Sequence, residues 1–76
     1  MAKKKFPISN TIRPLRFMQG EMTQQALADA VGVTRQTIVA IEKAKYSPSL
    51  ELAFKIARVF DKPLEEVFNY APEEED

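Results

Sequence analysis

The sequence contains no cysteine and no histidine among its 76 residues. Without cysteine the chain can form no disulfide, no zinc finger and no reactive thiol. Without histidine it lacks the commonest general base and the commonest metal ligand. No nucleophile–base pair is available from the other residues, so we expect no enzyme, no catalytic residue, no metal site and no cofactor.

Long hydrophobic runs are absent as well. No stretch of 18 apolar residues occurs, so we expect no membrane-spanning helix. Lys3, Lys4 and Lys5 are not followed by an apolar segment, which argues against a secretory signal and favours the cytoplasm. Glycine is rare, with two residues, while 45% of the chain is hydrophobic. This composition predicts one small packed domain.

The net charge of zero conceals an asymmetry along the chain. Residues 1–45 hold eight Lys or Arg and three Asp or Glu, a net of +5. Residues 46–76 hold three Lys or Arg and eight Asp or Glu, a net of −5. A polarised protein of this kind can present its basic part to phosphates. The alternative is that these charges only solvate the surface.

A short amphipathic helix is predicted within residues 34–42. Thr34 is a suitable N-cap, and Ile38 and Ile41 form a narrow apolar stripe. The polar side carries a set of outward residues, with the arginine on its flank: Arg35, Gln36, Val39, Ala40 and Lys43. Arg and Gln form paired hydrogen bonds with guanine and adenine edges respectively. This pattern is typical of a helix that reads DNA.

A second short helix precedes it. The segment 22–31 has Thr23 as its expected N-cap, and Gly32 stands where a helix end favours left-handed backbone geometry. Val33 fills the turn before Thr34 begins the next helix. Helix, glycine-containing turn and helix together make a helix-turn-helix arrangement.

Three further helices complete the prediction. The first covers residues 10–18 with Asn10 as N-cap, which places Pro14 at a barely tolerated fourth helical position. The fourth, 50–60, is capped by Ser49 and apolar over most of its surface, so we expect it to be central and buried, with Phe54 and Phe60 in the core. The fifth covers residues 64–68.

The domain organisation follows from these segments. We expect a flexible basic arm at residues 1–9, a helix-turn-helix domain at 10–70 and a disordered acidic tail at 71–76, with polar sequence from Asn69 onward. No strand-like alternation of useful length is evident. Lys3, Lys4 and Lys5 either reach along a DNA groove or form an unstructured start.

Several motifs resemble one known family. Thr23-Gln24, Leu27-Ala28, Val31-Gly32-Val33, residues 34–38 and Ala40-Ile41-Glu42 match the Cro/phage-repressor (Xre) type of helix-turn-helix. Residues 46–53, 55–57 and 63–68 are similar to its short, single-domain prokaryotic branch. The resemblance covers residues 10–70 and implies an all-α, lambda-repressor-like fold of five short helices, with the helix-turn-helix at helices two and three.

The resemblance also implies roles for individual residues. Base contacts would come from Thr34, Arg35, Gln36, Thr37, Val39 and Ala40. Phosphate contacts would come from Gln24, Lys43 and Lys45. Arg16 would pair with Glu42, and the implied core is Leu27, Ala28, Val33, Ile38, Ile41, Leu52, Ile56 and Ala57. The chain departs from the family at Ala44, where glycine is usual, and at Asp61, which also replaces a glycine.

We therefore expect a sequence-specific regulator of transcription that binds double-stranded DNA as a dimer. Val67, Phe68 and Tyr70 either close the core or form an exposed patch that pairs with a second copy. No segment for sensing a small-molecule effector is evident. The rival hypothesis is a protein-interaction module, such as an antitoxin or a coactivator with the same fold.

Overall fold

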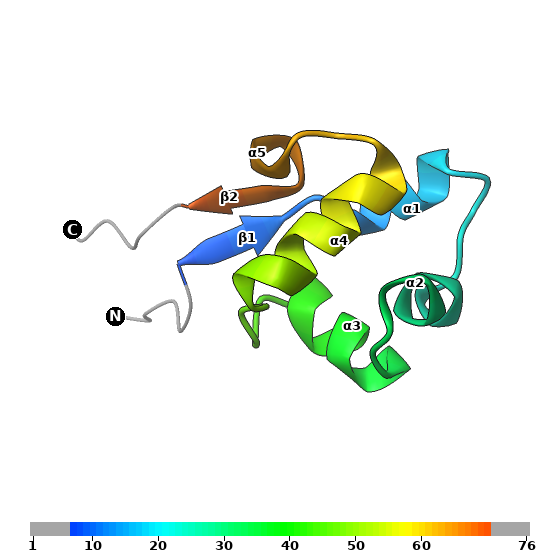
Figure 1. Cartoon of the computed structure of the whole chain (residues 1–76), viewed down its shortest axis with the longest axis horizontal. Coiled ribbons are helices and arrows are strands. Elements are labelled where there is room, and N and C mark those ends of the chain that lie inside the picture. Colours follow the sequence, from blue (N-terminus) through cyan, green and yellow to red (C-terminus); the bar gives the residue numbers. More distant parts are fainter. Residues whose placement is uncertain (1–6, 71–76) are drawn as a thin grey trace.

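The computed structural model describes residues 7–70 and has five helices and one small sheet within them. In chain order the elements are β1 (Ile8–Asn10), α1 (Ile12–Met18), α2 (Gln24–Val31), α3 (Arg35–Glu42), α4 (Leu50–Phe60), α5 (Leu64–Val67) and β2 (Phe68–Tyr70). The sheet lies at one end of the molecule and α2 at the other (Figure 1). The predicted all-α fold is confirmed in its five short helices, to which the structure adds the small sheet. Among the described residues, the longest helix has 11 residues and no helix could cross a membrane.

Three of the helices begin at the predicted caps. The hydroxyl oxygens of Thr23, Thr34 and Ser49 accept hydrogen bonds from the backbone N–H groups three residues further on, at 2.9, 3.3 and 3.1 Å. Each such cap contributes about 1 kcal/mol to helix stability. The α2–α3 turn is fixed by Gly32, whose φ of 78° ends α2 in left-handed geometry. These local signals therefore set the bounds of the helix-turn-helix.

The first helix begins later than predicted. Asn10 belongs to β1, and α1 begins at Ile12 with Thr11 in the capping position. Pro14 is consequently the third helical residue, where its missing N–H costs no intrahelical bond. The Asn10 side chain still helps this end, because its Oδ1 accepts from the Ile12 N–H at 3.1 Å.

The hydrophobic core draws on every helix. Its buried members are Ile12, Leu27, Ala28, Val31, Ile38, Ile41, Ile56, Ala57, Phe60 and Val67. Of the other predicted core residues, Val33 and Leu52 are partly buried and pack against this cluster. Phe60 is buried as predicted, but Phe54 is 50% exposed and Leu50 is 67% exposed. The prediction of a fully buried α4 is therefore wrong, because the structure covers only one of its two apolar sides.

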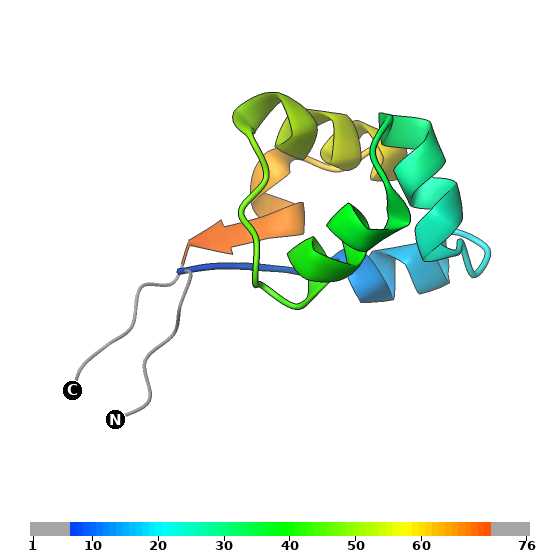
Figure 2. The ribbon, with the colours of Figure 1, turned by 90° about the horizontal axis from the view of Figure 1, so that it is seen from below.

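The sheet was not predicted. β1 and β2 pair antiparallel, with Ile8 opposite Tyr70 and Asn10 opposite Phe68. Thr11 continues the connection, since its N–H donates to the Val67 carbonyl oxygen at 2.9 Å. In Figure 2 the two strands run side by side away from the helices.

This sheet corrects three boundaries drawn from the sequence. The fifth helix ends at Val67, and Phe68, predicted as its last residue, belongs to β2. Ile8 and Ser9 belong to β1 rather than to an arm, and Asn69 and Tyr70 belong to β2 rather than to a tail. The lysines of the predicted arm and the acidic residues 71–76 lie outside the described residues.

An ordinary residue holds a left-handed conformation at the end of α3. Ala44 has φ of 58°, in the position where the family that the sequence resembles usually has glycine. Two hydrogen bonds close this end, from Ala44 N–H to the Ile41 oxygen and from Lys45 N–H to the Ala40 oxygen, both at 2.9 Å. Together they form a Schellman motif, which normally takes glycine at this position. Asp61 holds the same geometry after α4, with φ of 56°.

Candidate nucleic-acid interface

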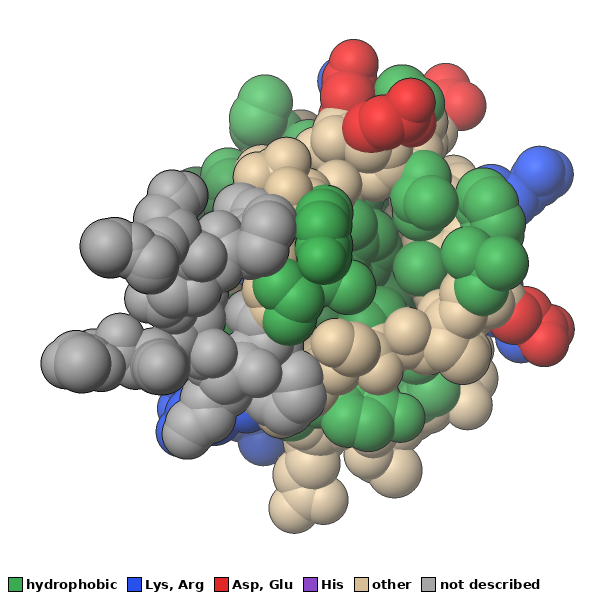
Figure 3. Space-filling model, turned by 90° about the vertical axis from the view of Figure 1, so that its left-hand side faces the viewer, with side chains coloured by type: hydrophobic (Ala, Val, Ile, Leu, Met, Phe, Trp, Pro, Cys, Tyr) green, Lys and Arg blue, Asp and Glu red, His purple; other side chains and the backbone are tan. Residues whose placement is uncertain are grey.

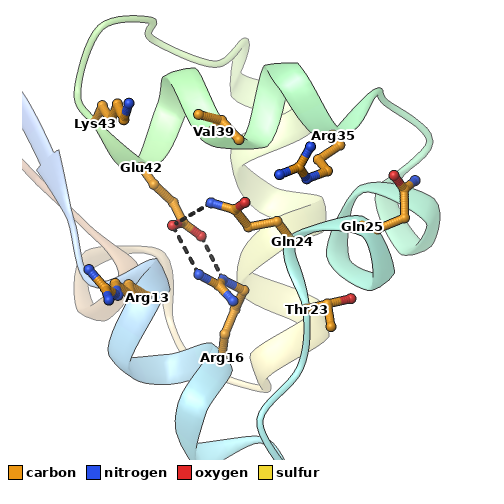
Figure 4. Close-up of a pocket in the computed structure, with 9 residues that line it drawn as sticks. All are labelled: Arg13, Arg16, Thr23, Gln24, Gln25, Arg35, Val39, Glu42 and Lys43. Carbon is orange, nitrogen blue, oxygen red and sulfur yellow. Dashed lines mark hydrogen bonds and ion pairs between the residues drawn. The ribbon is translucent and has the colours of Figure 1, made fainter.

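A groove runs between α3 and the adjoining parts of α1 and α2. It encloses about 550 Å³. The lining residues are Arg13, Arg16, Thr23, Gln24, Gln25, Arg35, Val39, Glu42 and Lys43. Figure 4 shows how they divide among the elements: two arginines come from α1, three residues from the start of α2 and its cap, three from α3, and Lys43 directly follows α3. The helix-turn-helix thus forms two walls of the groove and α1 forms the third.

The groove carries an excess of positive charge. Four of its lining residues are cationic and one, Glu42, is anionic. Arg16 neutralises Glu42, with 2.7 Å between Nε and Oε2. Within residues 7–70, Arg13, Arg35 and Lys43 have no carboxylate partner, and all three are exposed. The unpaired charge in the groove is therefore +3, which suits a polyanion.

The pairing of Arg16 with Glu42 is confirmed and extends further than predicted. A second bond joins Nη2 to Oε1 at 3.1 Å, and Nη1 donates to the Met22 carbonyl oxygen at 2.8 Å. The same Oε1 also accepts from Gln24 Nε2 at 3.2 Å. The side chains of Arg16 and Glu42 are only 14% and 9% exposed. This network ties α1, the entry to α2 and the end of α3 together beneath the groove.

The outward residues of α3 fall into two rows. Arg35, Val39 and Lys43 follow one another at four-residue spacing along the groove wall. Gln36 is exposed and Ala40 half-buried, and neither lines the groove. Lys45 is exposed in the segment after α3 and also lies outside it. The predicted contact residues thus cover the groove wall and the neighbouring outer surface of one helix.

Thr34 and Thr37, two of the predicted contact residues, already form hydrogen bonds within the protein. Thr34 caps α3, and its hydroxyl also lies 3.0 Å from the hydroxyl of Thr37. A hydroxyl can donate and accept at once, so this capping leaves some hydrogen-bonding capacity for a ligand. Thr34 is exposed, whereas Thr37 is half-buried.

Arg13 and Gln25 line the groove but were not predicted to be contact residues. Arg13 lies three residues before Arg16, a spacing that puts both side chains on one face of α1. That spacing would have identified Arg13 once Arg16 was assigned to this side of the domain. Gln25 follows the predicted Gln24, and its Nε2 donates to Asp29 Oδ1 at 2.9 Å.

A second, apolar hollow lies at the sheet end of the molecule. It encloses about 420 Å³ and is lined by Ile8, Leu64, Glu65, Phe68, Asn69 and Tyr70. Figure 3 shows hydrophobic side chains gathered on this end of the surface. Of the three residues predicted to join two copies, Val67 is 1% exposed and closes the core, Phe68 is partly buried, and Tyr70 is 70% exposed. Only the last two can reach a partner.

Sequence and structure comparisons agree on the family. A helix-turn-helix family model, HTH_3, matches residues 16–67. An uncharacterized HTH-type transcriptional regulator of Archaeoglobus fulgidus is 56% identical over 63 residues, which cover 83% of this chain and 89% of the relative. The cryptic phage CTXphi transcriptional repressor RstR of Vibrio cholerae is 36% identical over 59 residues, covering 78% of this chain and 52% of the repressor.

A solved structure extends the likeness to three dimensions. The restriction-modification controller protein C.AhdI of Aeromonas hydrophila superimposes with a TM-score of 0.65 at 29% identity, over 72% of this chain and 78% of the controller. Residues 16–67, which the family model matches, contain the three capped helices and the glycine turn described above. The chain therefore belongs to the Cro/phage-repressor type of helix-turn-helix proteins, a family of DNA-binding transcriptional regulators and not of enzymes.

Proposed function

We propose that this protein recognises a specific sequence in double-stranded DNA by inserting α3 into the major groove. The observation that supports this most directly is the row of Arg35, Val39 and Lys43 along α3 and its C-terminal end, beside a groove whose unpaired charge is +3. An α-helix with its side chains is about 10–12 Å across, which fits the width of about 12 Å of a B-form major groove. The cations around it supply the attraction to phosphates.

Each contact residue has a distinct part in the proposal. Arg35 and Gln36 open α3 and read base edges by paired hydrogen bonds. Thr34, Thr37, Val39 and Ala40 line the same interface and restrict which bases fit against it. Gln24, Lys43 and Lys45 bind phosphates and set the register of the domain on the duplex.

The second part of the proposal is that two copies bind a palindromic site as a homodimer. One copy presents a single eight-residue reading helix, which can contact only a few base pairs. Symmetric sites place two such helices about 34 Å apart, one turn of the duplex. The apolar hollow with Phe68 and Tyr70 is the surface proposed to join the copies. Val67 is excluded from this contact by its burial.

Location and regulation follow from the DNA target. A regulator acts where the DNA is, and in prokaryotic cells such as those of the relatives this is the cytoplasm. We propose that the amount of protein, or its association with a partner, sets occupancy of the site rather than a bound small molecule.

Two substitutions with different expected patterns test DNA reading. Sites are first selected from a random duplex pool, and affinities are then measured for the best site and for random duplex. Arg35→Ala should weaken the selected site about 5- to 150-fold, equivalent to about 1–3 kcal/mol, and relax the preference at one base pair. Lys43→Ala should weaken both duplexes alike and make the salt slope shallower by about one.

Equal losses on the selected and the random duplex for Arg35→Ala would show that α3 does not read bases. The rival protein-interaction role is distinguished by the unmodified protein itself. A DNA reader loses affinity for random duplex steeply as salt rises, whereas an interaction module need not bind duplex at all.

A further inference from the structure

Glu42 is shared by two donors, and this sharing has a consequence for the groove. Its Oε1 accepts from Arg16 Nη2 at 3.1 Å and from Gln24 Nε2 at 3.2 Å. The first bond belongs to the pairing of α1 with α3. The second reaches a residue that lines the groove and is half-buried. The Glu42 carboxylate therefore bonds both Arg16, which joins α1 to α3, and Gln24 at the start of α2 (Figure 4).

The chemistry of the carboxylate fixes which way the Gln24 amide points. An ionised carboxylate only accepts hydrogen bonds, so the NH₂ end of the amide must face Glu42 and its oxygen must face elsewhere. The amide is planar, and its two N–H bonds diverge within that plane. Holding one N–H on Oε1 therefore sets the direction of the other.

We propose that Glu42 is a positioning residue for DNA binding, which orients the Gln24 amide so that its remaining N–H donates to a phosphate. This inference rests on the proposed DNA-binding function. Glu42 itself makes no phosphate contact in this proposal, because an ionised carboxylate has no donor to offer and repels a phosphate. Its oxygens accept three bonds from within the protein. Prior orientation removes the entropy cost of ordering a flexible side chain when the phosphate binds.

Gln25 provides a matched control in the same groove. It is the same residue type, lies next along the chain, and also lines the groove. Its amide nitrogen, however, bonds Asp29 Oδ1 at 2.9 Å. Any dependence on Glu42 should therefore be found for Gln24 and not for Gln25.

A double-mutant cycle tests the coupling. Affinity for a random duplex is measured for the unmodified protein, Gln24→Ala, Glu42→Gln and the double variant, with circular dichroism confirming that each is folded at the assay temperature. Gln24→Ala should weaken binding about tenfold or more, as for loss of a hydrogen bond to a charged group. In the Glu42→Gln background the same change should cost less than about twofold, a coupling of the kind that such cycles detect. Gln25→Ala should cost the same in both backgrounds.

Equal losses from Gln24→Ala in the two backgrounds would overturn the proposal while leaving DNA binding intact. Absence of any duplex binding by the unmodified protein would instead reject the proposed function. A second measurement needs no variant and covers the case in which Glu42→Gln does not fold. The side-chain amide of Gln24 in the free protein should be as rigid by NMR as the backbone, with an order parameter of about 0.85, whereas the exposed Gln36 should fall below about 0.6. A Gln24 amide as mobile as that of Gln36 would also overturn the proposal.

Discussion

Arg16 and Glu42 meet in a two-point contact, with Nε to Oε2 at 2.7 Å and Nη2 to Oε1 at 3.1 Å. The pair joins α1 to α3 across 26 positions of the sequence. Both side chains are largely shielded from water. A planar guanidinium and a carboxylate in this arrangement form one of the stronger polar contacts available to a small domain.

Removing one partner should destabilise the domain measurably. Glu42→Ala leaves the Arg16 charge shielded and unpaired, and we expect the free energy of unfolding to fall by about 1–3 kcal/mol. The exposed pair Glu51–Lys55, at 3.5 Å, is the control, and Glu51→Ala should change stability by less than about 0.5 kcal/mol. Chemical denaturation monitored by circular dichroism measures both. Equal losses of stability in the two variants would mean that shielding from water adds nothing to the Arg16–Glu42 pair.

Replacing Ala44 by glycine should stabilise the protein. The left-handed conformation of Ala44 costs about 1 kcal/mol because its Cβ crowds the backbone, and glycine has no such penalty. Ala44→Gly should therefore raise the free energy of unfolding by somewhat less than this amount, since glycine also gains freedom in the unfolded chain. The same change at the exposed helical Ala26 should lower stability by about 0.5–1 kcal/mol. We expect the melting temperature to rise for Ala44→Gly and to fall for Ala26→Gly. A fall in both variants would show that the left-handed conformation of Ala44 is not strained.

Arg13 should act as a phosphate contact on the α1 side of the groove. Arg13→Ala should weaken selected and random duplexes by the same factor and make the dependence of log Kd on log salt shallower by about one. The exposed Arg58 lies outside the groove, beside Asp61, and serves as the control. Arg58→Ala should leave the salt slope unchanged. Identical slopes for the unmodified protein and Arg13→Ala would place Arg13 outside the interface.

Tyr70 should be needed for pairing of two copies. Truncation would remove the buried Val67 and damage the core, so a point substitution at the exposed Tyr70 is the cleaner test. Tyr70→Asp should weaken dimers in sedimentation because it puts a charge in the apolar hollow, while the thermal melt of the monomer changes little. Phe17 on α1 is equally exposed, at 68%, and lies outside this hollow. If Phe17→Asp weakens dimers and Tyr70→Asp does not, the proposed surface is wrong.

Local chemistry explains why the helix-turn-helix was predictable from the sequence. A capping hydroxyl acts on an N–H three residues away, and Gly32 acts on its own backbone, so neither depends on distant segments. The pairing of Arg16 with Glu42 has no such local signal. It was anticipated only because the chain resembles a family in which these positions pair.

Distant packing explains what the sequence did not reveal. Phe54 and Phe60 lie on a helix with apolar residues on two sides, and the sequence does not indicate which side another element will cover. The strands have three residues each and come from opposite ends of the domain, so no alternation within either one is long enough to predict it. Arg13 was not predicted for a related reason. It lines the groove only because α1 lies near α3 in the folded domain.

From the β1–β2 pairing we also expect an order in which the parts of the domain assemble. Ile8 can meet Tyr70 only after the chain between them is compact, because closing so long a loop costs entropy that few contacts repay. The contacts of α2 with α3 are short in sequence and can form first. The sheet has only three residue pairs and lies at one end of the molecule. Its backbone amides should therefore be the first to exchange with solvent in a hydrogen-exchange experiment. We therefore expect the domain to open from its ends inward, with the helix-turn-helix still assembled after the strands have separated.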